Sequence, residues 1–192
     1  MSWSLGEVQA LAIKAARGVG MPWGMADEAG FAARWLQANN APGLAALAGY
    51  LGWRDGMIET DHGLCPLCLG TTIMDAQRDV PNHLGRVKQP LLLAPYLAGT
   101  APSGLSLKWN GTAMIVSKHG LATTATREAL LIAETNCETS RATSQIGLTT
   151  MRVPDSEADA IALLNHFARR TYAPATEASR LSGAGAGTTD ND

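Results

Sequence analysis

The sequence predicts an α+β fold in a single domain: a mostly antiparallel sheet with an N-terminal layer of three helices and a C-terminal helix. Apolar residues recur with helical spacing in the first part of the chain and again near its end, and strand-like runs lie between them. The 192 residues, of which 46% are hydrophobic, suffice for one domain with a sizeable core. We therefore expect a helical segment at 1–52, a sheet of about five to seven strands at 64–153, a helix at 155–171 and a glycine-rich tail at 183–192.

The first helix is predicted to begin at a capping box. Ser4 stands three residues before Glu7, so its hydroxyl can accept the backbone N–H of Glu7 while the carboxylate reaches back. Proline and glycine separate this helix from two more. This segment also holds four of the five tryptophans, which we expect to pack in the core because large aromatics dominate core burial: Trp3, Trp23, Trp35 and Trp53.

A β-hairpin is the clearest feature of the middle of the chain. Asn110-Gly111, between the alternating runs 105–109 and 112–116, is a strong signal for a two-residue type I′ turn. That turn pairs Trp109 with Thr112, Leu107 with Met114 and Leu105 with Val116, which places all six side chains on one face.

The remaining strands are less sharply marked. We expect a polar loop between Glu134 and Ser144 that contains Cys137, and either Asp155 or Ser156 as the cap of the last helix. Further strands are expected at 64–73, 87–93, 121–126, 129–133 and 145–153.

Charge and apolar patterning exclude several classes of function. The formal net charge is −2 and no basic stripe is present, which argues against nucleic-acid binding. No apolar run approaches the ~20 residues that cross a bilayer, and residues 1–7 do not resemble a secretory signal. The three cysteines do not form the even, dense set of a secreted disulfide scaffold. A reducing cytoplasm is therefore the expected location.

Self-association is the first testable expectation. Charged residues make up 17% of the chain, below the ~25% that is usual for globular domains. A surface poor in charge suggests that part of it is covered in a homo-oligomer or by a partner subunit. Sedimentation at tens of micromolar should show a species heavier than the 20.1 kDa chain. A clean monomer at that concentration would contradict the prediction.

The strongest candidate for chemistry is the segment 61–68. Cys65 could act as a nucleophile activated by His62, with Asp61 orienting the base. The Cys65-x-x-Cys68 spacing also suits thiol–disulfide exchange, but exchange needs a helix that starts at Cys65, and the surrounding residues look strand-like. Zinc needs four ligands, and a structural site normally shows a second pair. The plainest alternative is two small buried residues in a strand. We expect no metal.

A second candidate site is the tail of the chain. Its glycines offer unobstructed backbone N–H groups that can form an anion nest, and its carboxylates could bind a hard cation. The alternative is a frayed terminus. We expect the tail to pack against the body or a neighbouring subunit, with these ligand-binding residues: Arg180, Gly183, Gly185, Gly187, Asp190 and Asp192.

Several short segments are distinctive. They are Ser2-Trp3-Ser4-Leu5 with Lys14-Ala15-Ala16-Arg17-Gly18, Trp23-Gly24 with Glu28-Ala29-Gly30, Cys65-Pro66, Pro90-Leu91-Leu92-Leu93 and Ser179-Arg180 to Asp192. In these segments the chain resembles an uncharacterised family of small proteobacterial proteins, a domain-of-unknown-function family. The resemblance implies a real domain and no activity.

Two classes of function stay open on the sequence. The first is a non-catalytic small-molecule-binding or accessory subunit of a metabolic system, acting as an oligomer. The alternative is a small metabolic enzyme that uses the Cys/His turn at 61–68. No nucleotide, flavin or phosphate-loop motif is present, which slightly favours the first class and leads us to expect no cofactor. Whether the chain is an enzyme is left open.

Overall fold

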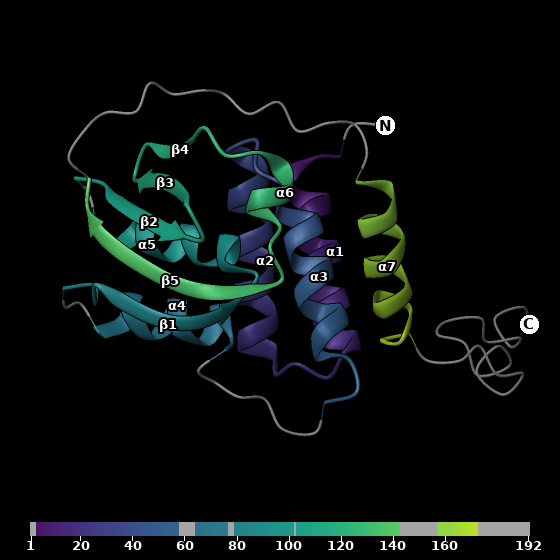
Figure 1. Cartoon of the computed structure of the whole chain (residues 1–192). Helices are drawn as coiled ribbons and strands as arrows, with labels where there is room; N and C mark the ends of the chain where they lie inside the picture. The colour runs from purple at the N-terminus through teal and green to yellow at the C-terminus, as the bar shows by residue number, and fades with distance from the viewer. Residues whose placement is uncertain (1–2, 58–63, 77–78, 102, 143–156, 173–192) are drawn as a thin grey trace, which may run out of the picture.

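The computed structural model describes residues 3–57, 64–76, 79–101, 103–142 and 157–172 (Figure 1). It confirms the α+β class. In chain order, the helices are α1 (Leu5–Gly18), α2 (Trp23–Ala38), α3 (Gly43–Arg54), α4 (Pro66–Ala76), the 3-10 helix η1 (Pro90–Leu93), α5 (Ala94–Thr100), α6 (Arg127–Leu130) and α7 (Ala158–Arg169). The strands are β1 (His83–Lys88), β2 (Leu105–Trp109), β3 (Thr112–Ser117), β4 (Gly120–Thr123) and β5 (Glu134–Arg141).

The described strands form one antiparallel sheet in the order β1-β5-β2-β3-β4. Figure 1 shows the sheet beside the layer of α1, α2 and α3, with α7 on the outer side of that layer. Helices α4 and α5 contact each other, and α5 also contacts β2 and β3. The apolar run through η1 and into α5, residues 90–98, is buried throughout and joins the helical layer to the sheet.

The predicted capping box and β-hairpin, which depend on residues close together in the sequence, are confirmed. Ser4 caps α1, with its hydroxyl accepting the Glu7 N–H at 3.2 Å and its own N–H donating to the Glu7 carboxylate at 2.8 Å. The hairpin pairs Trp109 with Thr112, as its two-residue turn requires, and the remaining pairs keep the predicted register. Trp109 is buried and its indole N–H donates to the Ala129 carbonyl at 3.0 Å.

Four segment predictions are wrong or need revision. Residues 66–76 form α4 where a strand was expected, and residues 127–130 form a helical turn that displaces the strand expected at 129–133. The expected strand 87–93 is divided, because Gln89 adopts a left-handed conformation (φ 44°) and Pro90 starts a 3-10 helix. The expected polar loop from Glu134 is strand β5, which pairs with β1 on one side and β2 on the other.

Other expectations fall outside the described residues or are only partly met. The strand expected at 145–153 and the expected caps Asp155 and Ser156 lie outside them. The strand expected at 121–126 is the shorter β4. Trp35 and Trp53 are half-buried as expected of core-packing residues, whereas the tryptophans at 3 and 23 are 39% and 67% exposed. No helix among the described residues is long and apolar enough to cross a membrane.

Helix α7 is held against the N-terminal layer by close backbone packing. It contacts α1 and α3, and Gly18 at the end of α1 lies directly against the backbone of Phe167. A Cβ atom at Gly18 would stand 1.9 Å from the Phe167 carbonyl oxygen. Arg170 extends the contact, since its guanidinium binds both carboxylate oxygens of Asp55 at 2.5 and 3.0 Å.

Candidate functional site

Helix α4 begins directly after Cys65. The Cys65 carbonyl accepts the first helical hydrogen bond, from the Leu69 N–H at 3.0 Å, and its Sγ accepts the Cys68 N–H at 3.3 Å. Cys65 therefore occupies the cap position, where a side-chain acceptor satisfies an otherwise unpaired N–H. Pro66 suits the first helical position because its missing N–H would have had no partner there. The strand expected at 64–73, which spoke against thiol–disulfide exchange, is wrong, because the helix that exchange requires begins at Pro66.

Two further donors converge on the Cys65 sulfur. The Tyr50 hydroxyl, from the buried face of α3, donates to Sγ at 2.9 Å. The Cys68 thiol also donates to it, and this bond is the largest of the causes that lower the pKa of Cys65 to about 6, against the opposing effect of burial. The helix N-terminus adds its positive end to the same atom. Cys65 is therefore the thiol of this pair that ionises first.

The partner groups shift in the opposite direction. The pKa of Cys68 is raised, first because its proton is held by the Cys65 sulfur and then because it is partly buried. Burial is the main cause that raises the pKa of Tyr50, and the neighbouring Cys65 adds to it. These opposite shifts favour ionisation of Cys65 over Cys68 and Tyr50, whose protons are directed toward its sulfur.

The two thiols differ in access. Cys65 is 1% exposed, whereas Cys68, in the first turn of α4, is half-buried. Cys68 is therefore the more accessible of the two thiols. The third cysteine, Cys137, is buried in β5, and burial raises its pKa to about 12. It contributes no thiolate near neutral pH.

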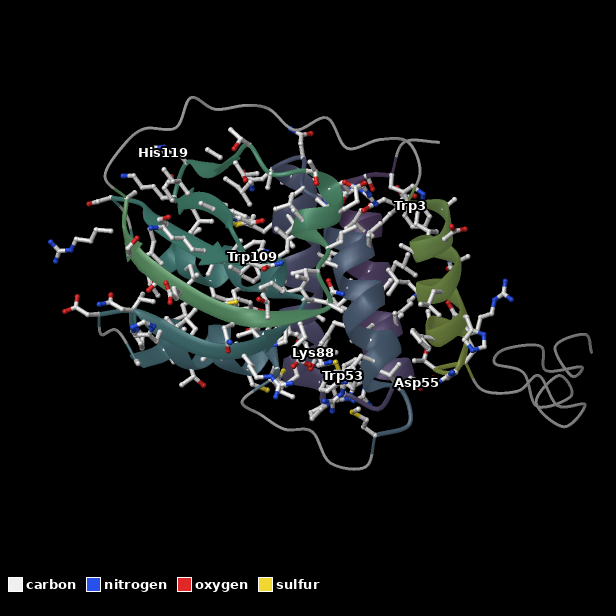
Figure 2. All side chains as sticks on the ribbon, in the orientation of Figure 1. Trp3, Trp53, Asp55, Lys88, Trp109 and His119 are labelled. Carbon is white, nitrogen blue, oxygen red and sulfur yellow. The ribbon has the colours of Figure 1, made fainter. Side chains whose placement is uncertain are left out.

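Cations and aromatic rings surround the pair. The Trp53 ring lies 5.9 Å from the Tyr50 ring, and the Lys88 ammonium lies 4.9 Å from the centre of the Trp53 ring, as Figure 2 shows for the labelled Lys88 and Trp53. The positive charge of Arg54 lowers the pKa values of Tyr50 and Cys68, in part offsetting the opposite effects of their neighbours. Its Nε atom is buried and has no hydrogen-bond partner among the described residues.

Gly70 sets the position of α4. An added Cβ at Gly70 would lie 2.3 Å from the Tyr96 ring, so only glycine permits this approach. Tyr96 is itself fixed, since its hydroxyl donates to the Glu28 carbonyl at 3.1 Å and its ring packs edge-on against Phe31 at 5.6 Å. The helix that carries both cysteines therefore rests on a rigid, buried support.

Of the expected site residues, the structure places Cys65 alone. His62 and Asp61 lie outside the described residues, as does the whole tail set: Arg180, Gly183, Gly185, Gly187, Asp190 and Asp192. Sequence reasoning missed Tyr50 and Arg54. Helical spacing over 43–54 puts both on one face, but nothing local connects that face to Cys65, which lies in a separate segment. Within the described part of the chain, no three His, Cys, Asp or Glu residues form a group that could hold a metal.

Comparison with known proteins gives a family without an assigned activity. The model of a family described as "Protein of unknown function (DUF3726)" matches residues 3–69. The matched segment holds α1, α2, α3 and the Cys65–Cys68 pair. This match confirms the resemblance to an uncharacterised family over residues 3–69, whereas the similar segments at 90–93 and 179–192 lie beyond it. No curated protein and no solved structure matches the chain.

Proposed function

We propose that Cys65 and Cys68 form a redox-active dithiol that exchanges with disulfides, so that the chain acts as a small thiol–disulfide oxidoreductase. The observation that carries the proposal is the start of α4 at Cys65, whose sulfur accepts hydrogen bonds from Tyr50 Oη and the Cys68 N–H. A first cysteine at a helix N-terminus is the arrangement in which C-x-x-C pairs hold a stable thiolate. The proposal takes up thiol–disulfide exchange at the Cys65-x-x-Cys68 spacing, which differs from the expected Cys/His enzyme because Tyr50 and Cys68, and not His62 and Asp61, are the partners of Cys65.

The exchange proceeds through the more accessible sulfur. The Cys68 proton first moves along the hydrogen bond to Cys65, and the Cys68 thiolate attacks an external disulfide R–S–S–R. A mixed disulfide forms on Cys68, and the departing R–S⁻ takes a proton from water. The Cys65 sulfur then attacks the Cys68 sulfur, and the second R–S group leaves with the Cys65 proton. Two electrons pass from the pair to the external disulfide, which becomes two R–SH.

Stabilisation of the Cys65 thiolate determines how oxidising the pair is. Each hydrogen bond to the thiolate stabilises the reduced form, which raises the reduction potential. The buried Tyr50 hydroxyl and the Cys68 N–H act in this direction. We therefore expect a potential between about −270 and about −120 mV, the range of dithiol catalysts, and above the roughly −300 mV below which structural disulfides lie.

A redox titration of the full chain tests the proposal. In mixtures of reduced and oxidised glutathione, the chain should lose two hydrogens by mass, and peptide mapping should place the new disulfide at Cys65–Cys68. Tyr50→Phe removes one donor and should lower the potential by about 30 mV, the equivalent of a tenfold change in the exchange constant. Cys65→Ser should stop at a mixed disulfide on Cys68.

Cys137→Ser is the matched control, because Cys137 is buried in the sheet and should leave the titration unchanged. A wild-type chain that stays reduced in excess oxidised glutathione would contradict the proposal. So would a titration that depends on Cys137 and not on Cys65.

The binding class from the sequence analysis stays a prediction. A small-molecule-binding or accessory subunit needs a ligand site apart from the buried Cys65 sulfur, and an oligomer needs a self-complementary surface. Sedimentation tests the second requirement directly, and a hollow beside the end of α1 is a candidate for the first.

A further inference from the structure

A hollow of about 470 Å³ lies where the ends of α1 and α7 meet the start of α2. Its volume falls within the roughly 300–1,000 Å³ of small-molecule sites. The two helices end side by side because Gly18 allows α1 to touch the Phe167 backbone (Figure 1). The residues that line the hollow are Ile13, Lys14, Arg17, Trp23, Arg170 and Thr171.

The hollow carries unbalanced positive charge. Arg170 is paired with Asp55, which Figure 2 shows near the end of α7. Lys14 and Arg17 form no ion pair with any described carboxylate, and their contacts are neutral: the Lys14 ammonium donates to the Tyr172 hydroxyl at 3.4 Å, and Arg17 donates to the Met21 carbonyl. Two positive charges therefore face the hollow without a described counter-ion.

Helix capping explains only part of this arrangement. Arg17 lies in the last turn of α1, where a cation offsets the negative end of the helix dipole. Lys14 lies a turn earlier, where that effect has faded. Neither position requires a concave site with an aromatic wall.

The aromatic wall is an exposed tryptophan. Trp23 is 67% exposed, and the Arg17 guanidinium lies 4.4 Å from the centre of its ring. Ile13 adds a half-buried aliphatic surface. A site with two cations that have no described counter-ion, one indole ring and one aliphatic patch is complementary to a ligand with an anionic head and an apolar body.

We propose that this hollow binds a small organic anion, in which a carboxylate or phosphate head contacts Lys14 and Arg17 and a flat apolar body packs on Trp23. The site is independent of the Cys65–Cys68 pair.

Calorimetric titration of the full chain with four probes tests the site. Phenyl phosphate and phenylacetate carry both the charged head and the ring, inorganic phosphate lacks the ring, and benzyl alcohol lacks the charge. At least one aromatic anion should bind about tenfold or more tightly than both benzyl alcohol and inorganic phosphate. The tighter of the two aromatic anions identifies the head group. Binding should weaken as salt is raised.

Single variants connect the binding to the lining residues. Lys14→Gln and Arg17→Gln should each weaken the aromatic anion about tenfold. Trp23→Leu should reduce the ratio by which the site binds the aromatic anion more tightly than inorganic phosphate. Lys118→Gln, which changes an exposed lysine between β3 and β4, is the matched control and should bind as wild type does. Thermal melting of each variant separates loss of binding from loss of fold.

Two outcomes would overturn the site. The first is that neither aromatic anion binds at millimolar concentration. The second is that Lys14→Gln and Arg17→Gln, with wild-type melting temperatures, bind as the wild type does. Cys65→Ser should leave the binding unchanged, so failure of the redox proposal and failure of the anion site are distinguishable.

Discussion

Gly18→Ala is expected to destabilise the chain by about 1–3 kcal/mol, although alanine is the better helix former. The added Cβ would stand 1.9 Å from the Phe167 carbonyl oxygen and 2.6 Å from its carbonyl carbon. Both atoms belong to the backbone of α7, so relief requires the whole helix to move. Denaturant unfolding should show the loss, and hydrogen exchange should show α7 opening before the sheet.

Gly24→Ala is the matched control for this prediction. Gly24 is also helical and exposed, and a Cβ there meets nothing within 4 Å. Without a clash, alanine should stabilise the chain by about 0.4–1 kcal/mol through lower entropy of the unfolded state. If Gly18→Ala is as stable as Gly24→Ala, the α1–α7 contact is looser than the structure indicates. The same movement of α7 should weaken anion binding in the adjacent hollow.

Features encoded within a few residues of one another could be predicted from the sequence. The capping box depends on Ser4 and Glu7 alone, and the hairpin register follows from the Asn110-Gly111 turn. In each case the chain provides both partners of the interaction at a fixed spacing. No distant residue is needed to decide between two conformations.

Segments whose conformation depends on distant neighbours were mispredicted. Residues 64–73 form a short apolar run that fits a strand as well as a buried helix, and the close approach of Tyr96 to Gly70 stabilises the helix from the other side of the core. Strand β5 is polar along its length, yet it lies between β1 and β2, and every backbone pair it forms joins it to distant segments. Neither the contact of Tyr96 with Gly70 nor the pairing of β5 can be inferred from the residues of each segment alone.

In the candidate site, too, the local features could be predicted from the sequence and the long-range contacts could not. The C-x-x-C spacing identified Cys65 and Cys68, because both lie in one turn of chain. The Tyr50 hydroxyl reaches Cys65 from α3, and that contact exists only in the folded chain. The hollow could not be predicted from the sequence, because it forms only where α1, α2 and the residues after α7 meet in the folded chain.

Raising the pH from about 6 to 9 should stabilise the reduced chain by up to about 4 kcal/mol relative to Cys65→Ser. The pKa of Cys65 is lowered to about 6 in the folded chain from its usual 9.0. Between these values the unfolded chain holds a proton that the folded chain has released, so the free energy of unfolding rises with pH. Below about 6 both states keep the proton, and the contribution vanishes.

At higher pH the free energy of unfolding is expected to fall as the pH rises. The pKa of Cys68 is raised, so above 9 the folded chain keeps a proton that the unfolded cysteine has lost. Burial is the main cause that raises the pKa of Tyr50, and burial persists in Cys65→Ser, so Tyr50 changes this difference little. The stability difference between wild type and Cys65→Ser should therefore reach a maximum near pH 9.

Denaturant unfolding across this range, in the presence of a reductant, gives the measurement. Tyr50→Phe should flatten the rise, because the loss of its hydroxyl returns the Cys65 pKa toward the usual value. The oxidised chain should show no rise, because a Cys65–Cys68 disulfide has no thiol to titrate. A wild-type chain whose stability relative to Cys65→Ser is constant between pH 6 and 9 would show that Cys65 ionises like an ordinary buried thiol, and the basis for a redox-active pair would be lost.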